Sequence, residues 1–371
     1  MSGHLKAVGV CSRPSLDGVD VVLIETDGDL SVECGPSLHV PYSRDMKIFL
    51  RRAITAAREG RDGAADIGKA AGEVTSAVVG AIERFLDQEK IKRTDIDVVG
   101  VGGHSILYRA PKGAAAPGRQ WRIGDGKTIA EEVRIDVVSD FEAADLAAGG
   151  YGAPLAPVFF RALIASMADR PDCPVGVIDL GAVAHVVYVP EQASPVDLLA
   201  YDSGPCLALL DKWAQARPAR KGAPPGAVND EVLRMIGLHP YLRLPPPKSL
   251  DRYSFSLDHV LKLSAEDGAA TLAAFTADCI ARAEVHLPEP PGGYICLGEG
   301  VERPALMQVL GDRLEAEVAT AEDAGWRNDT LDAECFAFLA VRSLRKTPLT
   351  YPKTTRAPAP TLGGVFYRAP V

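Results

Sequence analysis

The sequence predicts an α/β protein of two domains, in which helices cover a largely parallel sheet in each domain. Short apolar runs that suit buried strands alternate with stretches of helical periodicity along the chain, and this alternation is typical of α/β layers. The length of 371 residues is enough for two hydrophobic cores. Two halves with a similar order of strands and helices indicate a duplicated fold with a cleft between the halves.

The first half starts with a strand meander and continues with two helices. The meander covers residues 5 to about 40, and apolar residues at helical spacing predict helices over 44–58 and about 64–90. A short apolar run over 96–101 ends in glycine, which indicates a buried parallel strand. The segment 110–119 is rich in proline, glycine and alanine, so it is predicted to be a surface loop.

The rest of the chain continues the alternation of strands and helices. A strand over 135–138 ends at Asp140, a helix-like run follows to about residue 148, and a glycine-rich turn over 149–154 closes this unit. A second series begins with a strand over 175–180. The remaining predicted elements are proline-rich loops at 218–225 and 244–248, helices near 265–286, 304–314 and 331–345, and a strand over 294–297.

The composition argues against nucleic-acid and membrane binding. The chain has 40 Lys and Arg against 49 Asp and Glu, with a pI near 5.4, and its basic residues are scattered rather than clustered on one stripe. No apolar run approaches the roughly 20 residues that span a bilayer. The N-terminus lacks a signal-peptide core, so a cytoplasmic location is expected.

The cysteines are expected to be reduced and mostly buried. Seven of them are spread over the chain without a Cys-x-x-Cys pair, whereas disulfide frameworks and zinc sites need closer spacing. Cys11 and Cys206 fall within loops that matter for the site. For both, burial as a small core residue is favoured over a reactive thiol.

A polar turn near the start of the chain has the form of an anion-binding loop. An apolar run over 7–10 leads into the turn at 12–18, and a second strand-like run follows over 19–25. In such a turn the backbone N–H groups point at the anion, and small residues allow it to approach. The middle of this turn is Arg13-Pro14, and proline offers no N–H and fixes its own φ.

Five runs of residues carry the strongest likeness to a known family, at 122–126, 137–154, 239–251, 267–272 and 336–345. They resemble 1,6-anhydro-N-acetylmuramic acid kinases, which are actin-like sugar kinases that recycle peptidoglycan fragments, and the resemblance extends essentially from end to end. It implies a two-domain actin-like ATPase (ribonuclease H-like) sugar kinase fold with an interdomain cleft, residues 1–130 and 346–371 forming one domain and 131–345 the other.

The resemblance also implies an activity in amino sugar metabolism. Enzymes of this family hydrolyse the 1,6-anhydro bond and transfer the γ-phosphate of ATP to the O6 that is released, with Mg²⁺ neutralising the phosphates. Asp140 matches the family's catalytic aspartate, and a carboxylate at the end of a strand suits a general base. The alternative role for Asp140 is an N-cap on the following helix. Family members are typically homodimers, so a homodimer is expected.

The same resemblance assigns binding roles to other residues. Small-molecule partners, a nucleotide and an amino sugar, are implied. Asp17 and Asp179 are implied as Mg²⁺ ligands. The residues implied for the cofactor are Ser12, Arg13, Ser15, Asp17, Gly18, Asp20, Asp179, Gly181, Gly298 and Gly300, and those implied for the sugar are His104, Ser105 and Asp332.

The binding loops depart from the family pattern, which leaves other functions open. Pro14 occupies a turn expected to approach phosphates, and Glu299 occupies a glycine turn expected on the adenine side of the nucleotide. Glu142 places a second carboxylate beside Asp140. A nearby carboxylate raises the pKa of an aspartate and repels phosphate. One alternative is therefore a catalytically impaired or inactive relative, a possible pseudokinase, that binds a ligand or a partner. Another is an enzyme in which Arg13, His104 and Arg303 recognise a different anion.

Overall fold

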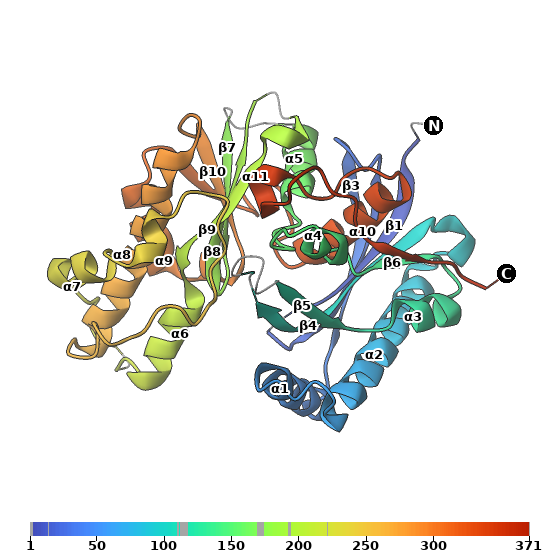
Figure 1. Cartoon of the computed structure of the whole chain (residues 1–371), viewed down its shortest axis with the longest axis horizontal. Coiled ribbons are helices and arrows are strands. Elements are labelled where there is room, and N and C mark those ends of the chain that lie inside the picture. Colours follow the sequence, from blue (N-terminus) through green and yellow to red (C-terminus); the bar gives the residue numbers. More distant parts are fainter. Residues whose placement is uncertain are drawn as a thin grey trace. The chain divides into compact units, whose positions relative to one another are not determined.

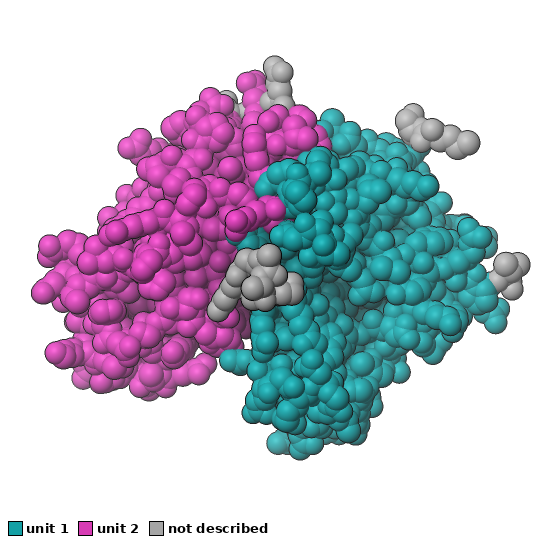
Figure 2. All heavy atoms as spheres, viewed as in Figure 1, with its two compact units in different colours: residues 1–168, 329–352, 357–371 teal, residues 169–328, 353–356 magenta. Residues whose placement is uncertain are grey.

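The chain folds into two compact units (Figure 2), which are described separately. Unit 1 comprises Met1–Ala168, Asp329–Pro352 and Ala357–Val371, and unit 2 comprises Asp169–Asn328 and Lys353–Arg356. The structure is a computed structural model, which describes residues 3–13, 15–109, 111, 118–168, 174–191, 194–220 and 222–370.

Unit 1 contains a mixed sheet with the strand order β12-β6-β4-β1-β2-β3, and β5 pairs with β4 (Figure 1). β1, β4 and β6 are parallel to one another, whereas β1, β2 and β3 form an antiparallel meander. The carboxyl ends of β1 and β6 therefore lie at the same edge of the sheet. The strands are β1 (Leu5–Ser12), β2 (Gly18–Thr26), β3 (Val32–Pro41), β4 (Val98–Arg109), β5 (Arg119–Ile123), β6 (Val137–Ser139) and β12 (Val365–Tyr367).

Helices cover both faces of this sheet. Val8 and Val10 of β1 share a hydrophobic core with α1 and α2 on one face. On the other face, α10 packs so closely that a Cβ on Gly9 would lie 1.8 Å from the carbonyl oxygen of Ala333. The helices of unit 1 are α1 (Arg44–Arg58), α2 (Ala65–Glu89), α3 (Gly126–Val133), α4 (Ala143–Ala147), α5 (Pro157–Ser166) and α10 (Leu331–Leu344), and α11 (Pro352–Thr355) follows α10 in the sequence.

Unit 2 contains a second mixed sheet, with the strand order β11-β10-β7-β8-β9. β7, β10 and β11 are parallel, so the carboxyl ends of β7 and β10 lie side by side. The strands are β7 (Val175–Leu180), β8 (Val183–Val189), β9 (Leu199–Pro205), β10 (Gly293–Leu297) and β11 (Glu317–Thr320), and the helices are α6 (Leu207–Ala216), α7 (Asp230–Ile236), α8 (Ala265–Ala283) and α9 (Pro304–Arg313). Short 3₁₀ turns occur at Arg93–Asp95, Pro195–Asp197, Pro240–Arg243, Glu284–His286 and Glu299–Glu302.

The division between the units differs from the predicted boundaries at 130/131 and 345/346. Residues 131–168 belong to unit 1 because β6 pairs with β4 in its sheet. α10 belongs to unit 1 as well, because it packs on β1 and β4. The predicted α/β class itself is confirmed, with helices packed on a mixed sheet in each unit. The predicted loop at 110–119 lies largely outside the described residues, and β5 begins at its last residue.

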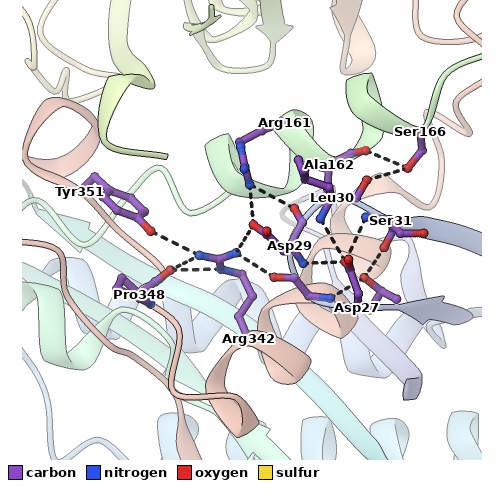
Figure 3. Close-up of polar contacts among 12 residues, drawn as sticks. Asp27, Asp29, Leu30, Ser31, Arg161, Ala162, Ser166, Arg342, Pro348 and Tyr351 are labelled. Atoms are coloured by element: carbon purple, nitrogen blue, oxygen red, sulfur yellow. Dashed lines mark hydrogen bonds and ion pairs between the residues drawn. The ribbon is translucent and has the colours of Figure 1, made fainter. Parts of the chain in front are cut away.

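Two buried arginines attach the β2–β3 turn to the rest of unit 1 (Figure 3). Arg342 of α10 donates to the carbonyl oxygens of Gly28 and Pro348, at 2.7 and 2.6 Å. Arg161 of α5 donates to the carboxylate of Asp29 at 2.7 Å. The turn at the far end of the hairpin is thereby held against two helices. In the described part of the chain, no helix is long and apolar enough to cross a membrane.

Candidate active site

Asp140 lies directly after β6, at the carboxyl edge of the parallel strands of unit 1. Its φ of +53° places it in the left-handed region, which costs about 1–2 kcal/mol for an L-residue although aspartate tolerates it better than most. The Ser139 hydroxyl donates to Asp140 Oδ2 at 3.0 Å, and the Tyr367 hydroxyl donates to the same oxygen at 3.5 Å. The side chain is exposed, and Oδ1 has no protein partner within the described residues. It is thus available to a ligand.

The structure does not support the capping role considered for Asp140. Helix α4 starts after an N-cap at Glu142, and no side-chain hydrogen bond caps it. Only the backbone of Asp140 takes part, because its carbonyl oxygen accepts the N–H of Ala143 at 3.3 Å. The carboxylate is therefore not needed to start the helix.

Glu142, the second carboxylate expected beside Asp140, is paired with a cation. Glu142 is 4% exposed, and its Oε1 accepts the Nε–H of Arg122 at 2.6 Å. The guanidinium group also donates to the carbonyl oxygen of Gly102 at 3.0 Å. Burial acts to lower the pKa of Arg122, but Glu142, Cys11 and Asp332 together raise that pKa. A cation from β5 therefore pairs with Glu142 beside Asp140, and the repulsion of phosphate by Glu142 stays a prediction.

Ser12 and His104 meet at the same edge of the sheet, where β1 and β4 pair in parallel. The Tyr42 hydroxyl donates to Ser12 Oγ at 2.6 Å, and Ser12 Oγ lies 2.8 Å from His104 Nδ1. With the Ser12 hydroxyl donating to Nδ1, the imidazole proton sits on Nε2, which is buried and has no hydrogen-bond partner among the described residues. Burial lowers the pKa of His104 to about 4, assisted by the charge of Arg122. His104 is therefore a neutral donor without an acceptor.

The turn after β1 uses several of its predicted cofactor residues internally. Asp20 is buried between Arg13 and His39, with 2.9 Å from Oδ2 to Arg13 Nε and 2.7 Å from Oδ1 to His39 Nδ1. A Cβ on Gly18 would lie 2.2 Å from the carbonyl oxygen of Val40, so this glycine serves the close pairing of β2 with β3.

The rest of this turn faces solvent in part. Ser15 and Asp17 are exposed and Arg13 is partly exposed, and Pro14 lies outside the described residues. The Nε of Arg13 is buried and forms an ion pair with Asp20 without the alignment of a hydrogen bond. Its guanidinium terminus has no partner among the residues with a described position. Arg13 therefore brings a positive charge to a turn in which proline removes an N–H donor.

The two other residues predicted for the sugar lie in different settings. Asp332, in the first turn of α10, keeps contact with solvent. The surrounding protein still desolvates it and raises its pKa, whereas Arg122 and Arg13 act in the opposite direction. Ser105 accepts a hydrogen bond from Gln120 Nε2 at 2.9 Å and pairs across to β5. Asp332 thus interacts electrostatically with Arg13 and Arg122. Ser105 already has a hydrogen-bond partner on β5.

In unit 2, two predicted glycines close around the end of β7. Gly298 has a φ of +84°, and a Cβ there would lie 2.5 Å from Asp179 Oδ1. A Cβ on Gly300 would lie 2.4 Å from the Cβ of Leu180. The N–H of Gly298 donates to Asn328 Oδ1 at 2.8 Å. The glycine turn therefore reaches Asp179, but one of its N–H groups is already used.

The backbone N–H groups at the start of α6 also have hydrogen-bond partners within the protein. The N–H groups of Cys206 and Ala208 donate to the carbonyl oxygen of Ala182, at 3.2 and 3.1 Å, and that of Leu207 donates to the carbonyl oxygen of Gly181 at 3.0 Å. Cys206 is fully buried, and burial raises the pKa of its thiol. A buried thiol with a raised pKa remains protonated, so Cys206 is a structural residue.

The described cysteines fit the expected reduced state. All those at described positions are free thiols. Cys34 is exposed, and Cys173 lies outside the described residues. The remaining thiols are buried, namely Cys11, Cys206, Cys279, Cys296 and Cys335.

A partly buried histidine–aspartate pair in unit 2 is not predicted by the sequence. His185 Nδ1 lies 2.5 Å from Asp202 Oδ1, where β8 pairs with β9. Burial alone would lower the pKa of His185, but Asp202 and Asp179 together raise it to about 9. Asp202 Oδ2 also accepts the N–H of Leu250 at 2.5 Å. His185 is opposite Asp179 in the β7–β8 ladder, so it adds a positive charge next to this carboxylate.

The predicted Mg²⁺ ligands, and Arg303 as a predicted anion-binding residue, are described within their own units. Asp17 belongs to unit 1 and Asp179 to unit 2. Within the positions that the structure describes, no group of three or more His, Cys, Asp and Glu side chains is arranged to hold a metal. Asp179 inside its glycine cradle still suits Mg²⁺, which binds through one or two carboxylates together with phosphates. Arg303 lies in unit 2, and its guanidinium is paired with Asp211 at 2.9 Å.

Comparisons with known proteins identify the family of the chain. The sequence profile of the anhydro-N-acetylmuramic acid kinase family matches residues 5–369. An anhydro-N-acetylmuramic acid kinase from Paramagnetospirillum magneticum is 41% identical over 367 residues, covering 96% of this chain and 98% of that protein. One from Methylobacterium nodulans is 39% identical over 385 residues, covering 98% and 100%. A solved structure, component A of (R)-2-hydroxyglutaryl-CoA dehydratase from Acidaminococcus fermentans, has a TM-score of 0.45 at 12% identity, covering 92% of this chain and 99% of that chain.

The family match spans nearly all residues of both units, including β6 with Asp140 and β7 with Asp179. The matched region also includes the turn after β1 and helix α10. The chain belongs to the anhydro-N-acetylmuramic acid kinase family, and its two units have the α/β architecture that the sequence predicts.

Proposed function

We propose that the protein is an ATP-dependent kinase that opens the 1,6-anhydro bond of anhydro-N-acetylmuramic acid and phosphorylates O6. Membership of the family supports the sugar and the phosphoryl transfer. The observation that carries the proposal is Asp140, an exposed carboxylate held through Oδ2 with Oδ1 left for a ligand. A carboxylate in this arrangement suits a general base that activates water.

In the proposed reaction Asp140 Oδ1 accepts a proton from the attacking water. The water oxygen forms a bond to C1 of the sugar, the bond between C1 and O6 breaks, and O6 attacks the γ-phosphorus of ATP. The bond from this phosphorus to the β-phosphate oxygen breaks, and ADP leaves. Mg²⁺ supplies positive charge to the phosphates when it is bound, and Asp179 is the residue that would hold it, with Asp17 as a second candidate.

Other residues are proposed to bind and orient the reactants. The Nε2–H of His104 donates to a sugar oxygen, because it is buried and otherwise without an acceptor. Asp332, at the start of α10, accepts a hydrogen bond from a sugar hydroxyl. Ser105, which follows His104 in the sequence, is a further proposed contact to the sugar. Arg13 supplies charge to the phosphates in place of N–H donors.

The phosphate side of unit 2 has its own proposed residues. Gly181, Gly298 and Gly300 keep side chains away from the end of β7, where a phosphate would approach Asp179. The exposed positions Ser15 and Asp17 complete the candidate contacts in the first turn. These roles remain predictions until ligand binding is measured.

Release of ADP tests this function directly. The wild-type protein is expected to release ADP only when ATP, Mg²⁺ and the anhydro sugar are all present. Asp140→Asn should lower kcat by about 10²–10⁴-fold, as expected for loss of a general base. Asp136→Asn, at the opposite end of β6, is the matched control and should keep the activity. Equal rates for Asp140→Asn and the wild type would remove Asp140 from the mechanism.

A second function, binding of a ligand or a partner without catalysis, is favoured by backbone N–H groups that already donate to oxygens of the protein. The N–H of Gly298 and those at the start of α6 bind protein oxygens, and Glu299 stands in the glycine turn. An inactive relative that binds a ligand or a partner would have fewer donors for phosphate. It predicts no thermal shift with ATP and Mg²⁺, whereas a nucleotide that binds the folded state must raise the unfolding temperature. A homodimer also remains a prediction.

A further inference from the structure

The turn that carries Asp140 is under backbone strain. Asp140 has a φ of +53°, a conformation that L-residues keep only where the surrounding structure enforces it. Its carboxylate is exposed, and within the described part of the chain its side chain makes polar contacts with Ser139 and Tyr367 alone. These contacts are made to Oδ2 and do not fix the backbone. The residues that follow Asp140 must therefore hold the turn.

Phe141 anchors the turn through its apolar side chain. It is 1% exposed, and its ring lies 5.5 Å from the ring of Phe336 in α10. A Cβ on Gly363 would lie 2.5 Å from the carbonyl oxygen of Phe141, so the C-terminal segment covers the backbone at this point. Phe141 thus fixes one side of the turn. It does not by itself prevent rotation of the Asp140 backbone, which Glu142 must restrain.

Glu142 anchors the turn through charge. Its buried carboxylate accepts from Arg122 at 2.6 Å, and Arg122 lies on β5 and also donates to Gly102 of β4. The guanidinium group is 5.3 Å from the ring of Phe336, so it packs on the same aromatic ring as Phe141. The ion pair therefore links the turn to two strands and to the face of α10.

We propose that Arg122 and Glu142 are positioning residues, whose ion pair holds the backbone of Asp140 in the orientation that directs Oδ1 at the reacting water. This inference rests on the proposed role of Asp140 as a general base. Neither side chain reaches the reacting atoms in this account. Their contribution is to hold the turn, and a small displacement of a catalytic group is enough to lower a rate about a hundredfold.

The pair also connects the base to the loop that carries His104. Arg122 binds the carbonyl oxygen of Gly102, and His104 follows two residues later on β4. Loss of either partner would leave a buried charge without its counterpart, which distorts the site. Exchange of the two charges would restore the attraction, because both side chains would still span β5 and the turn.

Single substitutions of Arg122 and Glu142, together with a double variant that exchanges their charges, separate an effect of the ion pair on the position of Asp140 from an effect on the stability of the fold. Glu142→Gln keeps the shape of the side chain, Arg122→Gln removes the cation, and the double variant Arg122→Glu with Glu142→Arg exchanges them. Arg119→Gln is the control, because Arg119 lies on the same strand and pairs with Asp62 on the surface. For each variant kcat, KM and the unfolding temperature are measured. The crystal structure of Glu142→Gln gives the φ of Asp140.

The single variants are expected to lower kcat while leaving KM nearly unchanged. Glu142→Gln and Arg122→Gln should lower kcat by about tenfold to a hundredfold and leave KM for the sugar within about twofold. The exchanged double variant should recover part of the lost kcat, because it restores the ion pair but not the hydrogen bond to the carbonyl oxygen of Gly102. In Glu142→Gln the backbone of Asp140 should leave the left-handed region. Arg119→Gln should match the wild type.

Three results would overturn the inference. Unchanged kcat in both single variants would show that the pair is not needed, and a loss confined to KM would assign it to binding. An unchanged φ at Asp140 in Glu142→Gln would remove the backbone effect, whatever the rates. Absence of turnover in the folded wild type would instead overturn the proposed function, and the φ measurement would still decide whether the pair holds the turn.

Discussion

Ser12 Oγ and His104 Nδ1 lie 2.8 Å apart although their residues are 92 positions apart in the sequence. The contact joins the end of β1 to β4, and Tyr42 of the segment after β3 completes it by donating to Ser12. It sets the tautomer of His104 and leaves its Nε2–H as a buried donor. A buried donor without an acceptor is costly, so we expect a ligand oxygen to accept a hydrogen bond from Nε2.

Replacement of His104 tests this role. His104→Phe keeps an aromatic ring of similar size but removes the donor, so KM for the anhydro sugar should rise about tenfold, as expected for one lost hydrogen bond. Tyr42→Phe removes only the donor to Ser12, and it should have a smaller effect. Steady-state kinetics at fixed ATP checks both variants. A KM for His104→Phe equal to that of the wild type would mean that Nε2 does not bind the sugar.

The His185–Asp202 pair predicts a dependence of stability on alkaline pH. The folded pKa of His185 is raised to about 9, above the value of about 6.5 in an unfolded chain. The folded state thus binds the proton more tightly, and the stabilisation is complete below pH 6.5 and is lost as the pH rises through about 9. The unfolding temperature of unit 2 should fall across this window. His185→Gln should flatten the decline, and a slope identical to the wild type would exclude the pair as its source.

Arg342 is expected to be important for the stability of unit 1. The side chain is completely buried and donates to the carbonyl oxygens of Gly28 and Pro348. Arg342→Met should lower the free energy of unfolding by about 3 kcal/mol, because two carbonyl groups lose their donor. Arg84→Met on the exposed face of α2 is the control and should change it by less than about 0.5 kcal/mol. Urea denaturation measures both values, and equal losses would contradict the assignment.

Gly298 is expected to be irreplaceable in the glycine turn of unit 2. A Cβ would lie 2.5 Å from Asp179 Oδ1, and the φ of +84° is unfavourable for alanine. Gly298→Ala should lower the unfolding temperature and abolish the thermal shift with ATP and Mg²⁺. Gly311→Ala is the matched control, because the space around Gly311 in α9 is open and alanine favours a helix. A nucleotide shift preserved in Gly298→Ala would separate this turn from nucleotide binding.

The sequence allows most elements with strong local signals to be predicted. The helix predicted over 44–58 is α1, whose Ser43 caps its first turn, and the strand predicted over 175–180 is β7. α5 gives no such signal, because it is buried around most of its surface and therefore lacks a polar stripe. β8 and β9 were also not assigned, although their alternation of side chains places His185 next to Asp202.

The candidate site is only partly predictable for a similar reason. Asp140 follows a strand that the sequence indicates, so its place at the sheet edge was expected. The partner of Glu142 was not, because Arg122 lies 20 positions away on β5 and no local pattern brings the two together. Contacts of this kind depend on strand register and tertiary packing, which the residue order near each side chain does not reveal.

The structure of the reaction product tests the central claim most directly. The wild-type protein is incubated with ATP, Mg²⁺ and 1,6-anhydro-N-acetylmuramic acid, and the product is examined by proton–phosphorus correlation NMR. The expected product has a phosphate on O6 and a free hydroxyl on the anomeric carbon, and Asp140→Asn should form neither. A folded wild-type protein that yields no phosphorylated sugar, or one in which the anhydro bridge stays intact, would contradict it.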